Sequence, residues 1–214
     1  MPTLPSQSAD LSAITARTIG HYDRNAEAFR AGTRDHDVSQ NIANLLAHVQ
    51  ATPPFAILDL GCGPGRDLRA FRDLGHHAVG VEGSSRLAAM ARADSGCEVW
   101  EQDFLALDLP PDRFDGVFAN ASLFHVPRRE LPRVLAELRA TLKAGGVLLC
   151  SNPRGDDVEG WQNERYGAFH SLDGWRAHVA AVGFVLLDHY YRPPGRPRAE
   201  QPWLVTVWRS AEPA

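Results

Sequence analysis

Between residues 55 and 151, short apolar runs alternate with segments whose apolar residues recur at helical spacing. We interpret the apolar runs as strands: FAILDL (55–60), HAVGVE (77–82), CEVWEQD (97–103), FDGVFAN (114–120) and GVLLCS (146–151). Strands that alternate with helices pair in parallel when each helix crosses a face of the sheet. The alternation therefore predicts an α/β fold, a three-layer α-β-α, Rossmann-like arrangement around a mostly parallel sheet.

Two further apolar runs follow with no helix between them, FVLLDHYY (184–191) and PWLVTVWR (202–209). They favour an antiparallel C-terminal hairpin and bring the expected sheet to seven strands. Helical spacing and terminal glycines predict helices at 11–30, 37–50, 84–93, 129–142 and 171–182. A further helix is expected through Leu68, Phe71 and Leu74 up to Gly75. The first helix should break near Gly20, and Ser84 or Ser85 should cap the helix at 84–93. The stretches 152–170 and 192–201 have no such pattern and are expected to be loops on the ligand side.

We expect the 214 residues to form a single domain. Residues 1–50 would be an N-terminal helical cap that starts with a loose polar tail over 1–10. Residues 51–151 would be the cofactor-binding half, and 152–214 the substrate-side loops and the C-terminal hairpin.

Composition narrows the class of partner. Hydrophobic residues make up 44% of the chain, its net charge is −4 and its pI is about 6.1. Such a protein has no general attraction for phosphate backbones, so we expect no nucleic-acid partner. No apolar run approaches the roughly 20 residues of a membrane span, and the N-terminus lacks a signal-peptide pattern. Three isolated cysteines suit a reducing compartment. We expect a cytoplasmic monomer or homodimer that does not bind membranes.

The loop Asp59-Leu60-Gly61-Cys62-Gly63-Pro64-Gly65 follows the first strand. Ligands of parallel sheets bind beyond the carboxyl ends of strands, and glycines let the backbone approach a ligand closely. The dinucleotide pattern G-x-G-x-x-G fails, because Arg66 occupies the third glycine's slot, and the Walker pattern is absent. The acidic Asp59 would repel phosphates but suits a cation. S-adenosyl-L-methionine, which has a sulfonium, an ammonium and no phosphate, matches these constraints.

These motifs resemble the class I S-adenosylmethionine-dependent methyltransferases over residues 55–151. Their first motif, an acidic residue before G-x-G-x-G, matches Asp59 and the loop glycines. The resemblance implies that Glu82 binds both ribose hydroxyls, that Asp103 contacts the adenine amino group and that Phe104 lines the adenine. The turn before the fifth strand reads Leu-Lys-Ala-Gly-Gly, with Ala144 in place of the family's usual proline.

The family further implies a tyrosine that covers the cofactor from a Y-D-x-x-A stretch, which Tyr22-Asp23-Arg24-Asn25-Ala26 matches. It places the end of the fourth strand, Asn120-Ala121, beside the methionine part of the cofactor. The full expected cofactor set is Tyr22, Asp59, Gly61, Cys62, Gly63, Gly65, Glu82, Gly83, Asp103, Phe104, Asn120 and Ala121. The cofactor would be S-adenosyl-L-methionine and the product S-adenosyl-L-homocysteine.

Fewer sequence motifs point to the residues that bind the methyl acceptor. His125, after the fourth strand, is the candidate general base, and Tyr22 is the second candidate catalytic residue; a structural role is the alternative for both. The candidate substrate-binding residues are Arg34, His36, His125, Arg154 and Tyr166. Trp161, Phe169 and His170 are candidates for an aromatic wall beside Tyr166, whereas Tyr190, Tyr191 and Trp203 are expected to pack under the final hairpin. No residue set suggests a metal, since nothing completes the His76-His77 pair.

The expected function is methyl transfer to an oxygen, nitrogen or sulfur of a small molecule by in-line displacement. The nucleic-acid methyltransferase motif [DN]-P-P-[YF] is replaced here by Asn120-Ala121-Ser122-Leu123, which argues against base methylation. A regulatory protein that binds the cofactor without methyl transfer is one alternative. A nicotinamide-dependent oxidoreductase is the other, and Arg66 argues against it. The acceptor, and whether a general base is used, stay open.

Overall fold

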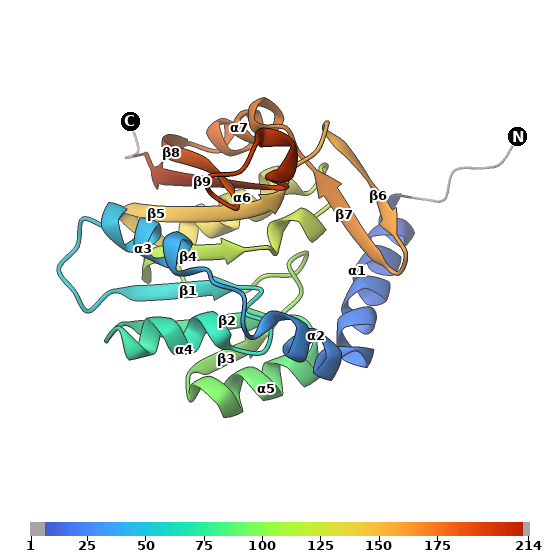
Figure 1. Cartoon of the computed structure of the whole chain (residues 1–214), viewed down its shortest axis with the longest axis horizontal. Coiled ribbons are helices and arrows are strands. Elements are labelled where there is room, and N and C mark those ends of the chain that lie inside the picture. Colours follow the sequence, from blue (N-terminus) through green and yellow to red (C-terminus); the bar gives the residue numbers. More distant parts are fainter. Residues whose placement is uncertain (1–6, 212–214) are drawn as a thin grey trace, which may run out of the picture.

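The computed structural model describes residues 7–211, in which seven strands form one sheet with the order β3-β2-β1-β4-β5-β9-β8 (Figure 1). The strands are β1 (Ala56–Leu60), β2 (His77–Glu82), β3 (Glu98–Glu101), β4 (Phe114–Asn120), β5 (Leu142–Pro153), β8 (Phe184–Arg192) and β9 (Trp203–Ser210). Strands β1 to β5 are parallel, whereas β9 is antiparallel to both β5 and β8. The expected α/β fold with an antiparallel C-terminal hairpin is confirmed.

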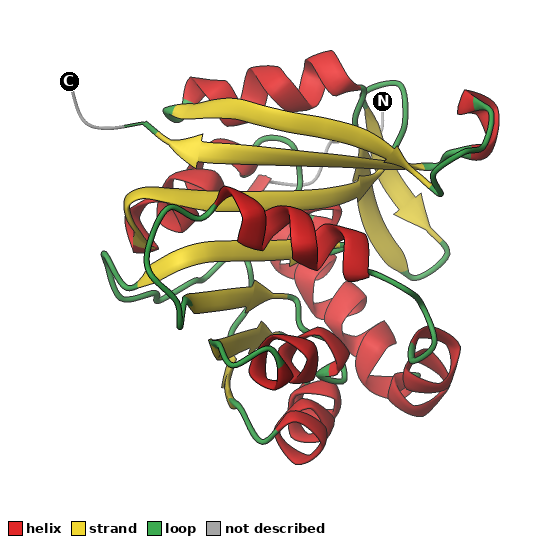
Figure 2. Cartoon of the chain, turned by 60° about the vertical axis from the view of Figure 1, so that its left-hand side comes forward, coloured by secondary structure: helices red, strands yellow, loops and turns green. Residues whose placement is uncertain are grey.

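Helices cover both faces of this sheet (Figure 2). The helices are α1 (Gln7–Arg24), α2 (Ala26–Thr33), α3 (Ser39–His48), α4 (Arg66–Asp73), α5 (Ser85–Ser95), α6 (Leu131–Thr141) and α7 (Leu172–Ala181). The first face carries α3, α4 and α5, and the second carries α6 and α7. Successive residues of β1 serve opposite faces: Ile57 packs with Leu45 of α3, and Leu58 packs in the cluster that contains Leu138 of α6. This double burial explains why the central strands are apolar throughout.

The strand order reverses between β1 and β4, which lie side by side at the centre of the sheet. In open parallel sheets such a reversal opens a crevice at the carboxyl ends of the strands, where ligands bind. Helix α1 crosses this edge instead of covering a face of the sheet (Figure 1), and it contacts α5 and the strand β7 (Arg165–Phe169). The N-terminal helices therefore cap the crevice.

A separate two-stranded hairpin, β6 (Val158–Gln162) and β7 (Arg165–Phe169), stands beside α1 (Figure 1). The sequence predicts a loop over 152–170, and the hairpin shows that this part of the prediction is wrong. Gln162 pairs with Arg165 across a two-residue turn whose first residue, Asn163, has a positive φ of 56°. The stretch 192–201 matches the expected loop, apart from a 3₁₀ turn at Arg198–Glu200.

Two expectations about the N-terminal segment also need correction. Helix α1 runs through Gly20, and the chain breaks at Asn25, whose Nδ2 donates to the carbonyl oxygen of His21 at 2.8 Å. The tail expected over 1–10 is helical from Gln7 onward, and residues 1–6 lie outside the described residues. Elsewhere the element boundaries agree to within a few residues, and Ser84 is the cap of α5, its side chain accepting a hydrogen bond from Leu87 N.

No helix within residues 7–211 has both the length and the apolar character that crossing a membrane requires. The three cysteines, Cys62, Cys97 and Cys150, are all free thiols.

Candidate active site

The glycine loop turns sharply between β1 and α4. The backbone N–H groups of Gly61 and Cys62 both donate to the carbonyl oxygen of Val81 in β2, at 2.8 and 3.1 Å. Gly61, Gly63 and Gly65 all have positive φ, at 74°, 54° and 91°. A Cβ on Gly61 would lie 2.5 Å from Cβ of Ser122. Position 61 therefore requires glycine for two reasons, its positive φ and the close approach of Ser122.

Glu82, at the end of β2, is tied to this loop. Its Oε2 accepts a hydrogen bond from the backbone N–H of Gly63 and its Oε1 accepts one from Ser84, both at 2.9 Å. Burial raises the pKa of Glu82, while these backbone hydrogen bonds lower it. A carboxylate accepts about four hydrogen bonds. Glu82 therefore keeps acceptor capacity for the hydroxyls of a ligand.

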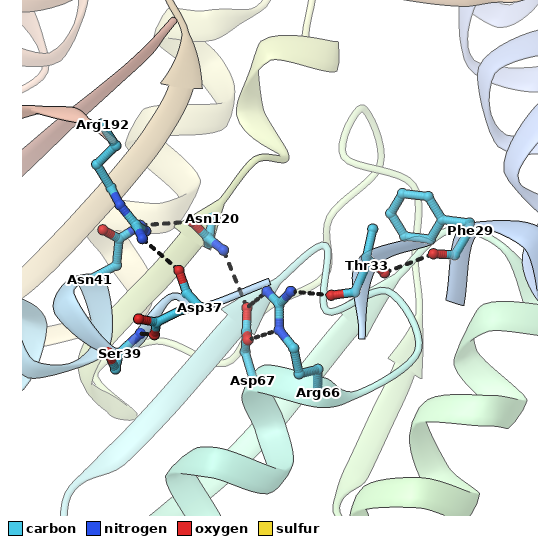
Figure 3. A network of polar contacts seen from close by, with 9 residues as sticks. All are labelled: Phe29, Thr33, Asp37, Ser39, Asn41, Arg66, Asp67, Asn120 and Arg192. Atoms are coloured by element: carbon cyan, nitrogen blue, oxygen red, sulfur yellow. Dashed lines mark hydrogen bonds and ion pairs between the residues drawn. The ribbon is translucent and has the colours of Figure 1, made fainter. Parts of the chain in front are cut away.

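A polar network connects the loop with α3 (Figure 3). Arg66 forms a bidentate ion pair with Asp67, at 2.7 and 2.9 Å. Nδ2 of Asn120, at the end of β4, donates to Asp67 at 3.3 Å, and Nδ2 of Asn41 donates to Oδ1 of Asn120 at 2.9 Å. Arg66 also donates to the backbone carbonyl of Thr33, at 2.7 Å. This network fixes the start of α4 and the end of β4 relative to α2 and α3.

Behind the loop lies a buried carboxyl group, that of Asp59. Burial, and then the negative charge of Asp67, raise its pKa well above the usual range. Its Oδ2 and the hydroxyl of Ser122 are buried without a hydrogen-bond partner among the described residues. The positive charge of a ligand beside this loop would favour the ionised form of Asp59, and a hydrogen-bonding group in the first cavity, which Ser122 lines, would satisfy the Ser122 hydroxyl. The ammonium and sulfonium of S-adenosyl-L-methionine fit this donor and charge pattern, and a phosphate does not.

Two cavities meet at the glycine loop. The first lies between α1 and the ends of β2 and β3 and is lined by Ile14, Thr15, Thr18, Ile19, Glu82, Gly83, Asp103 and Phe104, among others. The second has a volume of about 540 Å³, within the usual range for small-molecule sites, and its lining includes Arg66, Asn120, Phe124, Arg165, Arg192 and Trp203. Both cavities are lined by Tyr22, Phe29, Gly61, Gly63 and Ala121.

Tyr22 and His125 form a hydrogen-bonded pair at this boundary. Nδ1 of His125 lies 2.6 Å from the carbonyl oxygen of Tyr166, so Nδ1 carries the proton and donates it. Nε2 is then the acceptor for the hydroxyl of Tyr22, 2.8 Å away. Burial lowers the pKa of His125 to about 4 and raises that of Tyr22. His125 is neutral at pH 7 and a weaker base than the sequence analysis assumed.

Most of the expected cofactor residues come together in space. The two cavities are lined by Tyr22, Gly61, Cys62, Gly63, Glu82, Gly83, Asp103, Phe104, Asn120 and Ala121. Asp59 and Gly65 line neither cavity, and they support the loop from behind. A Cβ on Gly65 would lie 2.7 Å from Cα of Ala91 in α5, so this glycine permits the contact between loop and helix.

The expected substrate residues are more dispersed. His36 lines the second cavity, and His125 lines the first. Arg34 pairs with Asp35 at the surface, and Arg154 donates to the carbonyl of Arg198. The structure does not bring Arg34, Arg154 or the ring of Tyr166 to either cavity.

The aromatic residues expected to form a wall beside the acceptor do not all lie together. Phe169 packs near Phe124, whereas Trp161 is 40% exposed beside Tyr166 and under the guanidinium of Arg17. His170 is buried against Trp175. Trp203, expected under the hairpin, lines the second cavity instead.

Sequence reasoning missed two arginines of the second cavity. Arg192 ends β8 at the same edge as the other strand ends, so the rule on carboxyl ends of strands could have found it. Arg165 comes from the unexpected β6–β7 hairpin, and no local signal pointed to it. Residues 7–211 contain no group of three or more His, Cys, Asp or Glu side chains placed to hold a metal ion.

Comparisons with known proteins agree with this geometry. Residues 57–146 match the family model described as a methyltransferase domain. The sterol 24-C-methyltransferase of Candida albicans is 31% identical over 138 residues, which span 59% of this chain and 35% of that protein. The malonyl-[acyl-carrier protein] O-methyltransferase of Pectobacterium atrosepticum is 30% identical over 179 residues, which span 83% of this chain and 64% of that protein.

Among solved structures, the 1,6-didemethyltoxoflavin-N1-methyltransferase of Burkholderia thailandensis, with S-adenosylhomocysteine bound, has the same fold at a TM-score of 0.78. It is 22% identical, and the match covers 99% of this chain and 93% of that one. The chain spans about a third of the length of the first curated relatives it matches.

The fold and the site together define a Rossmann-like domain with a nucleotide-type cofactor crevice. Residues 57–146 resemble a methyltransferase domain, and the fold is shared with a structure that binds S-adenosylhomocysteine, which supports a class I S-adenosylmethionine-dependent methyltransferase with S-adenosyl-L-methionine as its cofactor.

Proposed function

We propose that this protein transfers the methyl group of S-adenosyl-L-methionine to a small-molecule nucleophile. The observation that carries the proposal is the meeting of two cavities at the glycine loop and Tyr22. The first has the acidic and apolar lining that an adenosine group needs, and the second is large enough for another ligand. A protein that only bound the cofactor would need no second cavity opening onto the first.

The cofactor, when bound, supplies a methyl group activated by a sulfonium. On our proposal, the carboxylate of Glu82 binds the ribose hydroxyls while Gly63 and Ser84 hold it in place. Asp103 and Phe104 bind the adenine at the far end of the first cavity. The positive charge of the cofactor beside the loop would lower the raised pKa of Asp59 and so favour its ionised form.

The residues at the boundary align the reactants. Displacement at a methyl carbon needs the nucleophile in line with the breaking bond, and such positioning contributes up to about 7–11 kcal/mol. Tyr22 and Phe29 line both cavities and pack edge to face, with ring centroids 5.1 Å apart. We propose that this pair closes the boundary and excludes water, and that His125 fixes the orientation of Tyr22.

We also propose that the acceptor is a small molecule rather than a nucleic acid, and that the protein acts in the cytoplasm as a monomer or homodimer. The net charge of −4 and the free thiols support this assignment. The oxidoreductase alternative gains no support, because Arg66 occupies the position of the third dinucleotide glycine and is committed to Asp67.

Isothermal titration with S-adenosyl-L-methionine, S-adenosyl-L-homocysteine and NAD tests the cofactor, and incubation with methyl-labelled cofactor tests transfer. We expect both adenosyl ligands to bind and label to pass to a small acceptor. Tight NAD binding without a response to either adenosyl ligand would overturn the proposal. Cofactor binding with no transfer to any acceptor would favour the regulatory alternative.

A further inference from the structure

Arg165, the first residue of β7, presents a cation to the second cavity. Its side chain is half-buried, and its Nη1 lies 3.3 Å from the hydroxyl oxygen of Tyr22. No carboxylate within residues 7–211 forms an ion pair with it. The carboxylate of its neighbour Glu164 pairs instead with Nδ1 of His21 and Nη2 of Arg24, at 3.3 and 3.0 Å. The guanidinium therefore keeps most of its hydrogen-bonding capacity for a ligand.

The other two arginines of this cavity are already occupied. Arg66 is neutralised by its bidentate pair with Asp67. Arg192 donates to the backbone carbonyl of Asp37 (Figure 3). Hydrogen bonds from Ser39, and to a smaller degree the charge of Arg192, lower the pKa of Asp37, so that carboxylate partly compensates Arg192. Arg165 is the cation best placed to bind an anion, and its planar fork matches a carboxylate.

Within residues 7–211, the side chains that line both cavities at once include no histidine and no carboxylate. Nε2 of His125 is engaged by the hydroxyl of Tyr22, and burial lowers the pKa of His125 to about 4. A nucleophile that arrives deprotonated needs no base. A carboxylate with an ordinary pKa of about 4 meets this condition at pH 7, whereas an alcohol does not. An ammonium would be repelled by Arg165.

We propose that the methyl acceptor is a small carboxylate held by Arg165 beside Tyr22, and that the product is its methyl ester. This inference rests on the proposed methyl transfer. A lone pair of the carboxylate oxygen forms the bond to the methyl carbon while the methyl–sulfur bond breaks and its electron pair stays on sulfur. No proton moves, and the opposite charges of the two reactants disappear together. The aromatic residues Phe124 and Trp203 in the same cavity suit an acceptor with an apolar body.

A second carboxylate could contact Arg165, namely that of the methionine part of the cofactor. The two sources are distinguished by affinity. Substitution of Arg165 should weaken the acceptor and leave S-adenosyl-L-homocysteine affinity within about threefold if the acceptor is the ligand. The reverse pattern would assign Arg165 to the cofactor and overturn the inference.

The test uses the full chain with methyl-tritiated S-adenosyl-L-methionine and a library of small carboxylic acids with their primary amides, alcohols, phenols, amines and thiols. We expect transfer to carboxylic acids and not to the matched amides. Mild alkali should release the label as volatile methanol, because it hydrolyses methyl esters and leaves ethers and N-methyl groups intact. Labelled products that resist alkali would overturn the inference and leave methyl transfer in place. Absence of transfer to every compound would count against the proposed function itself.

Three variants complete the test. Arg165→Gln should raise KM for the carboxylate at least about tenfold, and Arg165→Lys should give an intermediate value because it keeps the charge without the fork. Arg196→Gln is the matched control, since Arg196 is 65% exposed on its side chain and lines neither cavity. Titration of the acid against the S-adenosyl-L-homocysteine complex measures binding without turnover. An Arg165→Gln protein that binds and methylates the acid like the parent would sink the inference.

Discussion

The hydroxyl group of Tyr22 lies 2.8 Å from Nε2 of His125, across 103 residues of chain. The contact joins the N-terminal cap to the segment after β4, at the boundary of the two cavities. Because Nδ1 of His125 donates to Tyr166, the imidazole can only accept from the phenol. The pair therefore fixes Tyr22 in one orientation and leaves its oxygen free to accept from Arg165 at 3.3 Å.

His125→Ala should reduce turnover while cofactor affinity stays within about threefold. Removal of His125 leaves the buried hydroxyl of Tyr22 without its acceptor, which costs about 1–3 kcal/mol and displaces Tyr22 and Arg165 together. We expect kcat/KM to fall roughly 10- to 100-fold. Steady-state kinetics and titration with S-adenosyl-L-homocysteine measure the two effects. Unchanged turnover would remove His125 from the site.

The pH profile separates positioning from base catalysis. His125, with a pKa of about 4, is neutral throughout the range above pH 5.5, and the raised pKa of Tyr22 keeps the phenol protonated there. We expect kcat/KM to be flat between pH 6 and pH 8, a range chosen because it lies about two units above that pKa. An ascending limb near pH 7 that disappears in His125→Ala would restore a general-base role.

Glu82→Gln should weaken S-adenosyl-L-methionine binding by roughly 10- to 100-fold, because hydrogen bonds to a charged acceptor contribute about 1.5–3 kcal/mol. Part of the effect can come through the loop, since Glu82 also accepts from Gly63 and Ser84. Glu101→Gln is the matched control: Glu101 pairs with Glu82 in the register of β2 and β3 but is exposed and bonded to Arg92. Equal losses of affinity in both variants would contradict the role of Glu82.

The sequence was most informative where the chain is buried on both faces. Strands β1 to β5 and the helices between them follow from apolar runs and periodicity, since the sheet core demands continuous apolar residues. Asp59 was found from its place before the glycine loop at the end of a strand. Glu82 was found from the resemblance to the methyltransferase family, which implies a ribose-binding acid at the end of the second strand. Their binding roles stay predictions.

The β6–β7 hairpin was missed for a physical reason. Its strands read VEGWQ and RYGAF, with too few apolar residues for an alternating pattern. Long-range contacts with α1 hold it: Thr18 accepts from the backbone N–H of Tyr166 at 3.0 Å, and Arg17 donates to the carbonyl of Asn163 at 3.1 Å. Contacts across more than 140 residues leave no local trace, so Arg165 could not be placed from the sequence.

Gly65→Ala should destabilise the fold by at least about 2 kcal/mol more than Gly75→Ala. Both glycines have similar positive φ, 91° and 87°, so both alanines meet the same backbone strain of roughly 1–2 kcal/mol. Only at Gly65 would the new Cβ collide with α5, 2.7 Å from Cα of Ala91, whereas nothing lies within 4 Å at Gly75. Denaturant unfolding of the two variants gives the comparison, and equal losses would show that the loop can move away from α5.

Folding stability should fall below pH 6.5 because of His170. Burial, and then the charges of His178 and Arg128, lower its pKa to about 4, against the smaller opposing effects of Asp157 and Glu159. A pKa lower in the folded than in the unfolded state means that the unfolded chain binds more protons. The contribution is therefore complete above the unfolded pKa of 6.5 and is lost as the pH falls toward 4, by roughly 2 kcal/mol at pH 5.

His170→Leu should remove this component. Neither ring nitrogen of His170 has a hydrogen-bond partner among the described residues, so an apolar side chain loses no bond there. The difference in folding stability between pH 8 and pH 5 should be smaller than in the parent by roughly 2 kcal/mol. Any packing cost of the substitution is the same at both pH values and therefore cancels in this difference.

His77→Gln is the control: His77 is exposed, so this variant should leave the stability difference between pH 8 and pH 5 nearly unchanged. His125 shifts in the same direction and is still present, so part of the pH dependence should persist in His170→Leu. An undiminished difference would mean that His170 is already protonated in the folded protein near pH 5.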